Sequence, residues 1–374
     1  MYTIGVLLFP AYKQWPSLAT NSKWAGLPLM AAALIAGSFA NTVSHLVLTQ
    51  GVLYAIGGSI IYYPTLAFLD EWFVQRKGLA YGIMWAGTGS PSYSSPDFPC
   101  ILSPAKATLT AILIGTAGLI IPFVMNFLLS TYGFRTTLRI WAASLIILSG
   151  PLIYFLRPRL PISSVSQPQR YGLSFLKTSA FWFFLLGVII ESLGYFIPSL
   201  YLPTYARSLG LSPSIGTLLI ALVNASGVVS TVLGGMLVDC VHVTTVIALS
   251  TVGTMVAVFL FWGLSTALPL LCIFSILYGF FAGGFVSTFG GIVKAVKERD
   301  ERADVGTLIG LLSAGRGIGA VASGPLSEML LTGSPWQDRT GAAYGSGFGS
   351  LIVFTGVTAA VGGVSFLGKR LGWV

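Results

Sequence analysis

The stretch FFLLGVIIESLGYFIP at 183–198 lies inside an apolar segment, residues 180–205, in which Glu191 is the only charged residue. A helix needs about 20 apolar residues to cross the hydrocarbon core of a bilayer, and this segment is longer. A charge at that depth costs at least about 2.5–3.5 kcal/mol on insertion scales, so it is placed against protein rather than lipid. The segment therefore predicts a transmembrane helix with an inward-facing glutamate.

Nine further apolar segments with few charges follow the same pattern along the chain. They lie at 24–41, 45–68, 109–132, 138–156, 214–238, 243–264, 267–293, 305–331 and 345–367. Hydrophobic residues make up 55% of the 374-residue chain and charged residues 8%, with a mean hydropathy of +0.84. Soluble domains carry about 25% charged residues, so the composition excludes a soluble globule. It predicts an all-α polytopic membrane protein with about 10–11 transmembrane helices.

Positive charges are concentrated between the apolar segments. The net charge is +9, from 20 Lys and Arg against 11 Asp and Glu. In so apolar a chain this excess indicates loop charge that sets topology, so we expect a lipid bilayer and not a nucleic acid as the partner. The stretch 157–179 is polar, with four basic residues and no acid, and it predicts a cytoplasmic linker. It would separate an amino-terminal bundle, 1–156, from a carboxyl-terminal six-helix bundle, 180–374.

Two parts of the amino-terminal half depart from this regular pattern. The apolar run within 1–16 is too short for a complete span, and we interpret it as the tail of a helix whose beginning is missing. Residues 90–116 contain four prolines together with Asp97 and Lys106, which cannot continue a membrane helix. Either 78–89 is a half-helix that dips into the protein, or 90–116 is a gene-model insert within one original helix. We favour the insert.

Signatures of catalysis and metal binding are missing from the sequence. Cys100, Cys240 and Cys272 lie far apart, with no CxxC spacing and no histidine cluster nearby, which implies neither a disulfide framework nor a metal site. The loops carry no Gly-rich phosphate loop, HExxH or GxSxG motif. We therefore expect no enzyme activity and no cofactor.

Several motifs taken together carry a family resemblance. They include QGVLYAIGGSIIYYPTLAFLDEWFVQRKGLAYGIMWAGTG at 50–89, GFRTTLRIWA at 133–142 and GTLIGLLSAGRGIGAVASGPLSEML at 306–330. With these motifs the chain resembles the fungal-type monocarboxylate porters of the major facilitator superfamily. The resemblance implies two helical bundles around a central cavity that opens alternately to the two sides of the membrane.

The resemblance also implies a cytoplasmic latch that opens and closes during the transport cycle. Its residues here would be Asp70, Glu71, Arg76, Lys77 and Asp239. The alternative for the basic pair is simple anchoring of the loop at the membrane surface. Two expected features are absent: a first helix that bears a binding-site lysine, and an arginine on the eighth helix, which has serine and threonine instead.

Glu191 and Arg316 are the ionisable residues that lie near the middle of a span, at similar depths in their segments, so the two can form a pair. The resemblance implies that both helices border the central cavity. The functional hypothesis is that Arg316 binds a substrate carboxylate and Glu191 carries a coupled proton. The alternatives are a static buried ion pair, or a glutamate and an arginine that are each bonded to backbone groups of glycine-kinked helices. Further candidates for substrate binding are a polar and three aromatic residues: Asn224, Tyr195, Phe281 and Phe285.

The sequence thus predicts a proton-coupled carrier of small organic anions, such as monocarboxylates, in the plasma or vacuolar membrane. One alternative is a truncated, non-transporting membrane protein that acts as a sensor or assembly partner. Another is a carrier of a vitamin or a hydrophobic metabolite. An accessory membrane subunit is left open.

Overall fold

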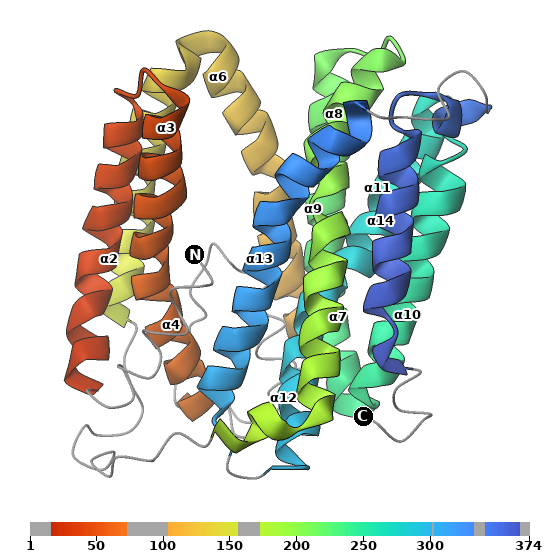
Figure 1. Cartoon of the computed structure of the whole chain (residues 1–374). Coiled ribbons are helices and arrows are strands. Elements are labelled where there is room, and N and C mark those ends of the chain that lie inside the picture. Colours follow the sequence, from red (N-terminus) through yellow and green to blue (C-terminus); the bar gives the residue numbers. More distant parts are fainter. Residues whose placement is uncertain (1–15, 73–103, 156–172, 301–302, 333–340, 367–374) are drawn as a thin grey trace. The chain divides into compact units, whose positions relative to one another are not determined.

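The computed structural model describes residues 16–72, 104–155, 173–300, 303–332 and 341–366, and these contain helices and turns without a β-strand (Figure 1). The prediction of an all-α protein is thereby confirmed. The chain divides into two compact units, which are described separately. Residues 90–103 of the predicted insert and 157–172 of the predicted linker lie outside the described residues, whereas 104–116 belong to helix α6 (Pro104–Phe155) and 173–179 to η3 (Leu173–Lys177) and the start of α7 (Ser179–Tyr195). The insert and the linker both stay predictions.

The first unit is built from the amino-terminal helices and the later part of α6. Its elements are α2 (Pro16–Gly37), α3 (Val43–Leu46), the π-helical η1 (Val47–Leu53), α4 (Tyr54–Trp72), α6 (Pro104–Phe155) from Val124 onward and the start of α13 (Val305–Thr332) up to Ala314. Helices α2 and α4 pack closely, because a Cβ on Gly26 would lie 2.7 Å from the Gly57 carbonyl oxygen. Small residues allow such close approach between helices in lipid.

Helix α6 is broken at Gly133, which has φ 73° and ψ 173°. A side chain is strained at positive φ, so glycine suits this position. The break lies between the two predicted spans 109–132 and 138–156. The sequence therefore placed this division correctly.

The second unit contains the other helices. They are η3 (Leu173–Lys177), α7 (Ser179–Tyr195), α8 (Ile197–Ser208), α9 (Pro213–Cys240), α10 (Val243–Val256), η4 (Ala257–Trp262), α11 (Leu268–Gly283), η5 (Gly284–Ser287), α12 (Thr288–Lys297), α13 (Val305–Thr332) from Gly315 onward, η6 (Ala342–Gly345) and α14 (Gly349–Gly362). Helix α10 packs against both α11 and α14 (Figure 1). Large buried aromatic residues fill the core of this unit, among them Tyr205, Trp262, Phe274 and Tyr278.

The apolar segment 180–205 is not one helix, as the sequence predicted, but two. Helix α7 ends at Tyr195 and α8 begins at Ile197, followed by Pro198 in its first turn. Proline has no backbone N–H and disfavours helical geometry in the residues before it, which accounts for the break. The hydroxyl of Tyr278 donates a hydrogen bond of 2.9 Å to the Tyr195 carbonyl at the junction.

Seven of the described helical segments are long and apolar enough to cross a membrane, and 24–37 and 349–362 are shorter apolar helices. Each of the ten segments predicted from hydropathy overlaps a described helix. Many large apolar side chains, including Ile147, Val321 and Met329, are exposed on helices. Exposed apolar surface of this extent is what lipid covers, so the chain is an integral, multi-pass membrane protein.

Candidate functional site

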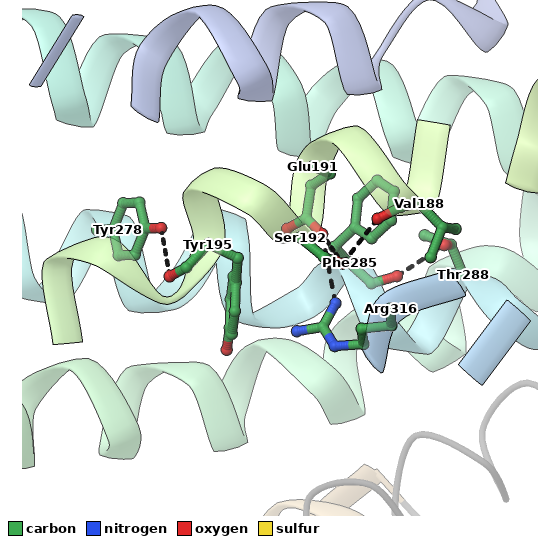
Figure 2. Close-up of polar contacts among 8 residues, drawn as sticks. All are labelled: Val188, Glu191, Ser192, Tyr195, Tyr278, Phe285, Thr288 and Arg316. Carbon is green, nitrogen blue, oxygen red and sulfur yellow. Dashed lines mark hydrogen bonds and ion pairs between the residues drawn. The ribbon is translucent and has the colours of Figure 1, made fainter. Parts of the chain in front are cut away.

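A buried ion pair connects α7 and α13 in the second unit. Arg316 Nη1 donates a hydrogen bond of 3.3 Å to Glu191 Oε2, and the two residues are 3% and 7% exposed (Figure 2). Charge-assisted hydrogen bonds of good geometry are shorter, about 2.7–2.9 Å, and Arg–carboxylate pairs are often bidentate. This single, long contact leaves most of the guanidinium unused. Among the described residues, Glu191 is its only hydrogen-bond acceptor.

Glycines on α13 bring Arg316 to Glu191. A Cβ on Gly319 would lie 2.6 Å from the Ile189 carbonyl oxygen and 2.7 Å from Ser192 Cβ. A Cβ on Gly315 would lie 2.7 Å from a side-chain atom of Leu185. Gly315 and Gly319 are four residues apart and share one face of α13, so they form a small-residue strip against α7. The strip brings the neighbouring arginine within reach of the carboxylate.

Helix α14 packs against α7 near Glu191 in the same way. A Cβ on Gly362 would lie 2.8 Å from Glu191 Cβ, and a Cβ on Gly194 would lie 3.2 Å from Thr355 Cα. The glutamate is therefore fixed by close backbone contacts with α13 and with α14. Such packing holds its carboxylate in one place, because neither neighbouring helix can shift without a clash.

Aromatic rings surround the guanidinium. Arg316 Cζ lies 4.4 Å from the centre of the Tyr195 ring and 5.6 Å from that of Phe196. The Tyr195 ring stacks on Tyr278 with 6.4 Å between centroids. Cation–π contacts of this kind contribute from about 0.5 kcal/mol at exposed sites to about 2 kcal/mol where water is excluded. They keep Arg316 charged and in place with little help from hydrogen bonds.

A small cavity of about 10 Å³ lies beside Glu191 and is lined by residues of α7, α10, α11, η5 and α14. Tyr195, Phe281 and Phe285, three of the predicted binding residues, line it with Glu191, whereas Arg316 does not. Its volume corresponds to about one water molecule. The cavity is therefore too small for an organic anion. A substrate would have to bind the Arg316 guanidinium outside this cavity.

The structure brings some of the predicted residues together and leaves one apart. Arg316 contacts Glu191, the partner that the sequence allowed for it, and it also contacts the ring of Tyr195. The cavity beside Glu191 is lined by Phe281 and Phe285. Asn224 lies on α9 with an exposed side chain and does not line the cavity. The roles assigned to all of these residues stay predictions.

The predicted gating residues are not brought into one site. Asp239 is exposed in the last turn of α9. Asp70 and Glu71 belong to the last turn of α4, but their side chains are outside the described set. Arg76 and Lys77 lie outside the described residues. The latch therefore stays a prediction.

Hydroxyl residues around the cavity escaped the sequence analysis. Ser250, Thr251 and Thr254 come from α10, and Thr355 comes from α14. The sequence carried a weak signal for the α10 group, because Thr254 lies four residues after Ser250 and three after Thr251 on an apolar helix. A lone threonine such as Thr355 gives no such signal.

Comparison with known proteins identifies the family. Residues 184–371, half of the chain, match the model described as Major Facilitator Superfamily, and this stretch includes both Glu191 and Arg316. The chain belongs to the Major Facilitator Superfamily. The superfamily part of the sequence resemblance is thereby confirmed, while the monocarboxylate porter branch stays a prediction.

Curated members of this superfamily from filamentous fungi resemble the chain along most of its length. The MFS-type transporter pynF of Aspergillus niger is 24% identical over 330 residues, covering 88% of this chain and 69% of that protein. The Fujikurins efflux protein of Gibberella fujikuroi is 26% identical over 342 residues, covering 90% and 64%. The chain thus spans about two-thirds of the length of these relatives.

A solved structure confirms the major facilitator fold. The nucleoside transporter NupG aligns with a TM-score of 0.61 and 15% identity, covering 99% of this chain and 87% of that one. At this identity the likeness concerns the fold alone.

Proposed function

We propose that the chain is a secondary transporter that moves a small organic anion together with a proton by alternating access. Membership in a transporter family supports the transport itself. The observation that carries the rest of the proposal is the buried pair of Arg316 and Glu191, joined by one hydrogen bond of 3.3 Å. The residence of the protein in the plasma or vacuolar membrane belongs to the same proposal.

Coupling follows from the chemistry of this pair. Without substrate, the carboxylate of Glu191 neutralises Arg316, which avoids the free energy of an unpaired buried charge. When Glu191 takes up a proton it becomes neutral, and the guanidinium needs another anion. A substrate carboxylate supplies that charge, since arginine binds carboxylates through its planar fork of donors. Anion and proton then move together, because either one alone leaves a charge without a partner.

Access to the guanidinium requires a change of conformation. Arg316 is 3% exposed, although most of its N–H donors have no acceptor among the described residues. An anion can therefore reach it only when the packing around α13 opens. This burial supports alternating access, in which the site is exposed to one side of the membrane at a time.

A second candidate function is the proton-driven export of a largely apolar acid. The aromatic faces of Tyr195 and Phe196 beside Arg316 suit a substrate that combines an anionic group with apolar surface. The name of one relative, the Fujikurins efflux protein, describes export. The same two charged residues would then exchange a proton for the substrate rather than carry both in one direction.

Reconstitution into proteoliposomes tests the proposal. We expect uptake of radiolabelled monocarboxylates, with lactate, pyruvate and benzoate as probes, to rise at least about tenfold when a pH gradient is imposed with its acidic side outside. R316Q should abolish uptake because it removes the anion partner. E191Q should remove the dependence on the gradient because the amide cannot take up a proton.

The amount of protein that is folded in the vesicles at the assay temperature serves as the control for both variants. Gradient-driven uptake that persists in R316Q would remove Arg316 from the binding site. Uptake that ignores the gradient in the unaltered protein would remove the proton role of Glu191. Stimulation only by an outward-directed substrate gradient would favour the exporter, and no transport of any probe would favour the non-transporting alternative.

A further inference from the structure

One buried hydroxyl beside Glu191 has no hydrogen-bond partner. Thr355 on α14 is 1% exposed, and among the described residues its Oγ1 contacts no donor or acceptor. Threonines elsewhere in the unit donate to their own helix, as Thr358 does to the Phe354 carbonyl at 3.0 Å and Thr254 to Ser250 at 2.8 Å. An unsatisfied buried hydroxyl is unfavourable, because folding removes its hydrogen bonds to water, so this exception requires an explanation.

The cavity at Glu191 provides that explanation. Thr355 and Glu191 both line it, and its volume of about 10 Å³ is close to what one water molecule requires. A buried water makes about three hydrogen bonds to otherwise unsatisfied groups. Here it would have Thr355 Oγ1 and Glu191 Oε1, an oxygen that accepts no other hydrogen bond among the described residues. The site is therefore polar enough and large enough for one water.

The cation that contacts Glu191 does not line the cavity, whereas the neutral phenols of Tyr195 and Tyr278 do. Arg316 approaches from α13, and the ionisable groups beside it are the phenols of Tyr195 on α7 and Tyr278 on α11. Helices α10 and α14 contain no ionisable residue, and they line the cavity with three hydroxyl residues of α10 and with Thr355 and Ala359 of α14. Figure 2 shows Arg316 on one side of Glu191 and the ribbon of α14 on the other. The cavity thus gives access to the carboxylate away from the guanidinium.

We infer that a water molecule binds in this cavity between Thr355 and Glu191 and exchanges the coupled proton with Glu191. The inference rests on the proposed function, in which Glu191 carries that proton. In the step itself, a protonated water transfers a proton to Glu191 Oε1 and remains as neutral water; release is the reverse. Because Arg316 does not line the cavity, the proton avoids a cation that would repel it.

Proton exchange at Glu191 can be measured without a known substrate. In rapid-mixing infrared spectroscopy of the purified full chain, transfer from H₂O to D₂O shifts the band of a protonated carboxyl group, and E191Q identifies the band of Glu191. We expect T355V, which replaces the hydroxyl by a methyl group of similar volume, to slow the exchange about tenfold. T355S retains the hydroxyl and should exchange within about twofold of the unaltered protein.

T358V is the matched control. It makes the same isosteric change on the same helix, at a hydroxyl that bonds its own backbone and does not line the cavity. It should leave the exchange rate unchanged. Equal exchange rates in T355V and in the unaltered protein would overturn the water site. Equal slowing in T355V and T358V would overturn it as well, because Thr355 would then act only through packing.

Two further outcomes separate the inference from the proposed function. If no carboxyl band that depends on Glu191 appears at any pH, Glu191 carries no proton, and both proposals fail. If the band is present and titrates but T355V leaves its exchange unchanged, only the water site fails. Loss of the band on addition of sodium ions, prevented by T355V, would assign the cavity to a sodium ion and overturn the proton relay.

Discussion

Two arginines stack on aromatic rings, one in each unit, and their surroundings differ. Arg139 in the first unit is exposed, lies 4.8 Å from the centre of the Phe39 ring and donates from Nε to Ser38 Oγ at 3.1 Å. Arg316 in the second unit is buried, lies 4.4 Å from the Tyr195 ring and donates to Glu191. Among the described residues, no carboxylate contacts Arg139.

This difference shows what a buried charge demands of its surroundings. Where the arginine side chain is exposed, water solvates the guanidinium, so a ring and a hydroxyl are sufficient partners. In the interior, desolvation costs several kcal/mol per ion, and the arginine requires an anion. Glu191 supplies that anion in the closed structure. One proton can neutralise this counterion. The arginine is then suited to binding an anionic substrate in place of the glutamate.

Breaking the buried pair should have the largest effect. R316Q and E191Q each leave one uncompensated charge, and each should lower the free energy of unfolding by about 3–5 kcal/mol. The double variant E191Q/R316Q leaves no charge and should recover most of this loss. R139Q should change stability by less than about 0.5 kcal/mol. Thermal unfolding in detergent at neutral pH provides the measurement.

Equal losses in R316Q and R139Q would contradict the comparison, because burial would then make no difference. A double variant as unstable as the sum of the two single variants would show that the charges do not interact. Either result would also weaken the coupling mechanism, which depends on mutual neutralisation.

Moving α13 away from α7 should have an intermediate effect. G319A places a methyl group at 2.6 Å from the Ile189 carbonyl oxygen, so the helices must separate and the ion pair must lengthen. Overpacking costs about 1–3 kcal/mol, and transport should fall about tenfold. G324A on the same helix meets nothing within 4 Å and should be neutral. Uptake and melting temperature are measured for both, and equal behaviour would exclude the role of the glycine strip.

Removing the ring beside each arginine should have the smallest effect. Y195L deletes the ring over Arg316 and should weaken substrate affinity about fivefold, since a desolvated cation–π contact contributes about 1–2 kcal/mol. Y195F retains a ring and should differ little. F39L deletes the corresponding ring at Arg139 and should not alter the affinity. Concentration dependence of uptake gives these values, and a loss in Y195F equal to that in Y195L would assign the effect to the hydroxyl.

Much of the fold and part of the site could be predicted from the sequence. Hydropathy located the helices, because the demand for about 20 apolar residues per span is imposed by the bilayer itself. Glu191 and Arg316 stood out because ionisable residues are rare at that depth. The break between α7 and α8 was missed, although Pro198 is visible in the sequence, because apolar character continues across it.

The partners of Glu191 were harder to predict. Its contact with Arg316 could be predicted because the two residues lie at similar depths in their spans. The cavity forms only where four helices meet, and no pattern of residues within one helix predicts such a meeting. Thr355 is ordinary by composition and becomes unusual only when its hydroxyl is seen to lack a partner. The latch residues Arg76 and Lys77 lie outside the described part of the chain, so their prediction rests on the family resemblance.

The junction between α7 and α8 has a mechanical consequence. The two helices are separate, and the Tyr195 carbonyl between them is bonded to the Tyr278 side chain at 2.9 Å instead of to a following amide. Bending at this point sacrifices one hydrogen bond to a side chain, whereas bending a continuous helix disrupts a whole turn of backbone bonds. A reorientation of α8 at this junction would therefore leave Glu191, one turn earlier on α7, in its place between α13 and α14.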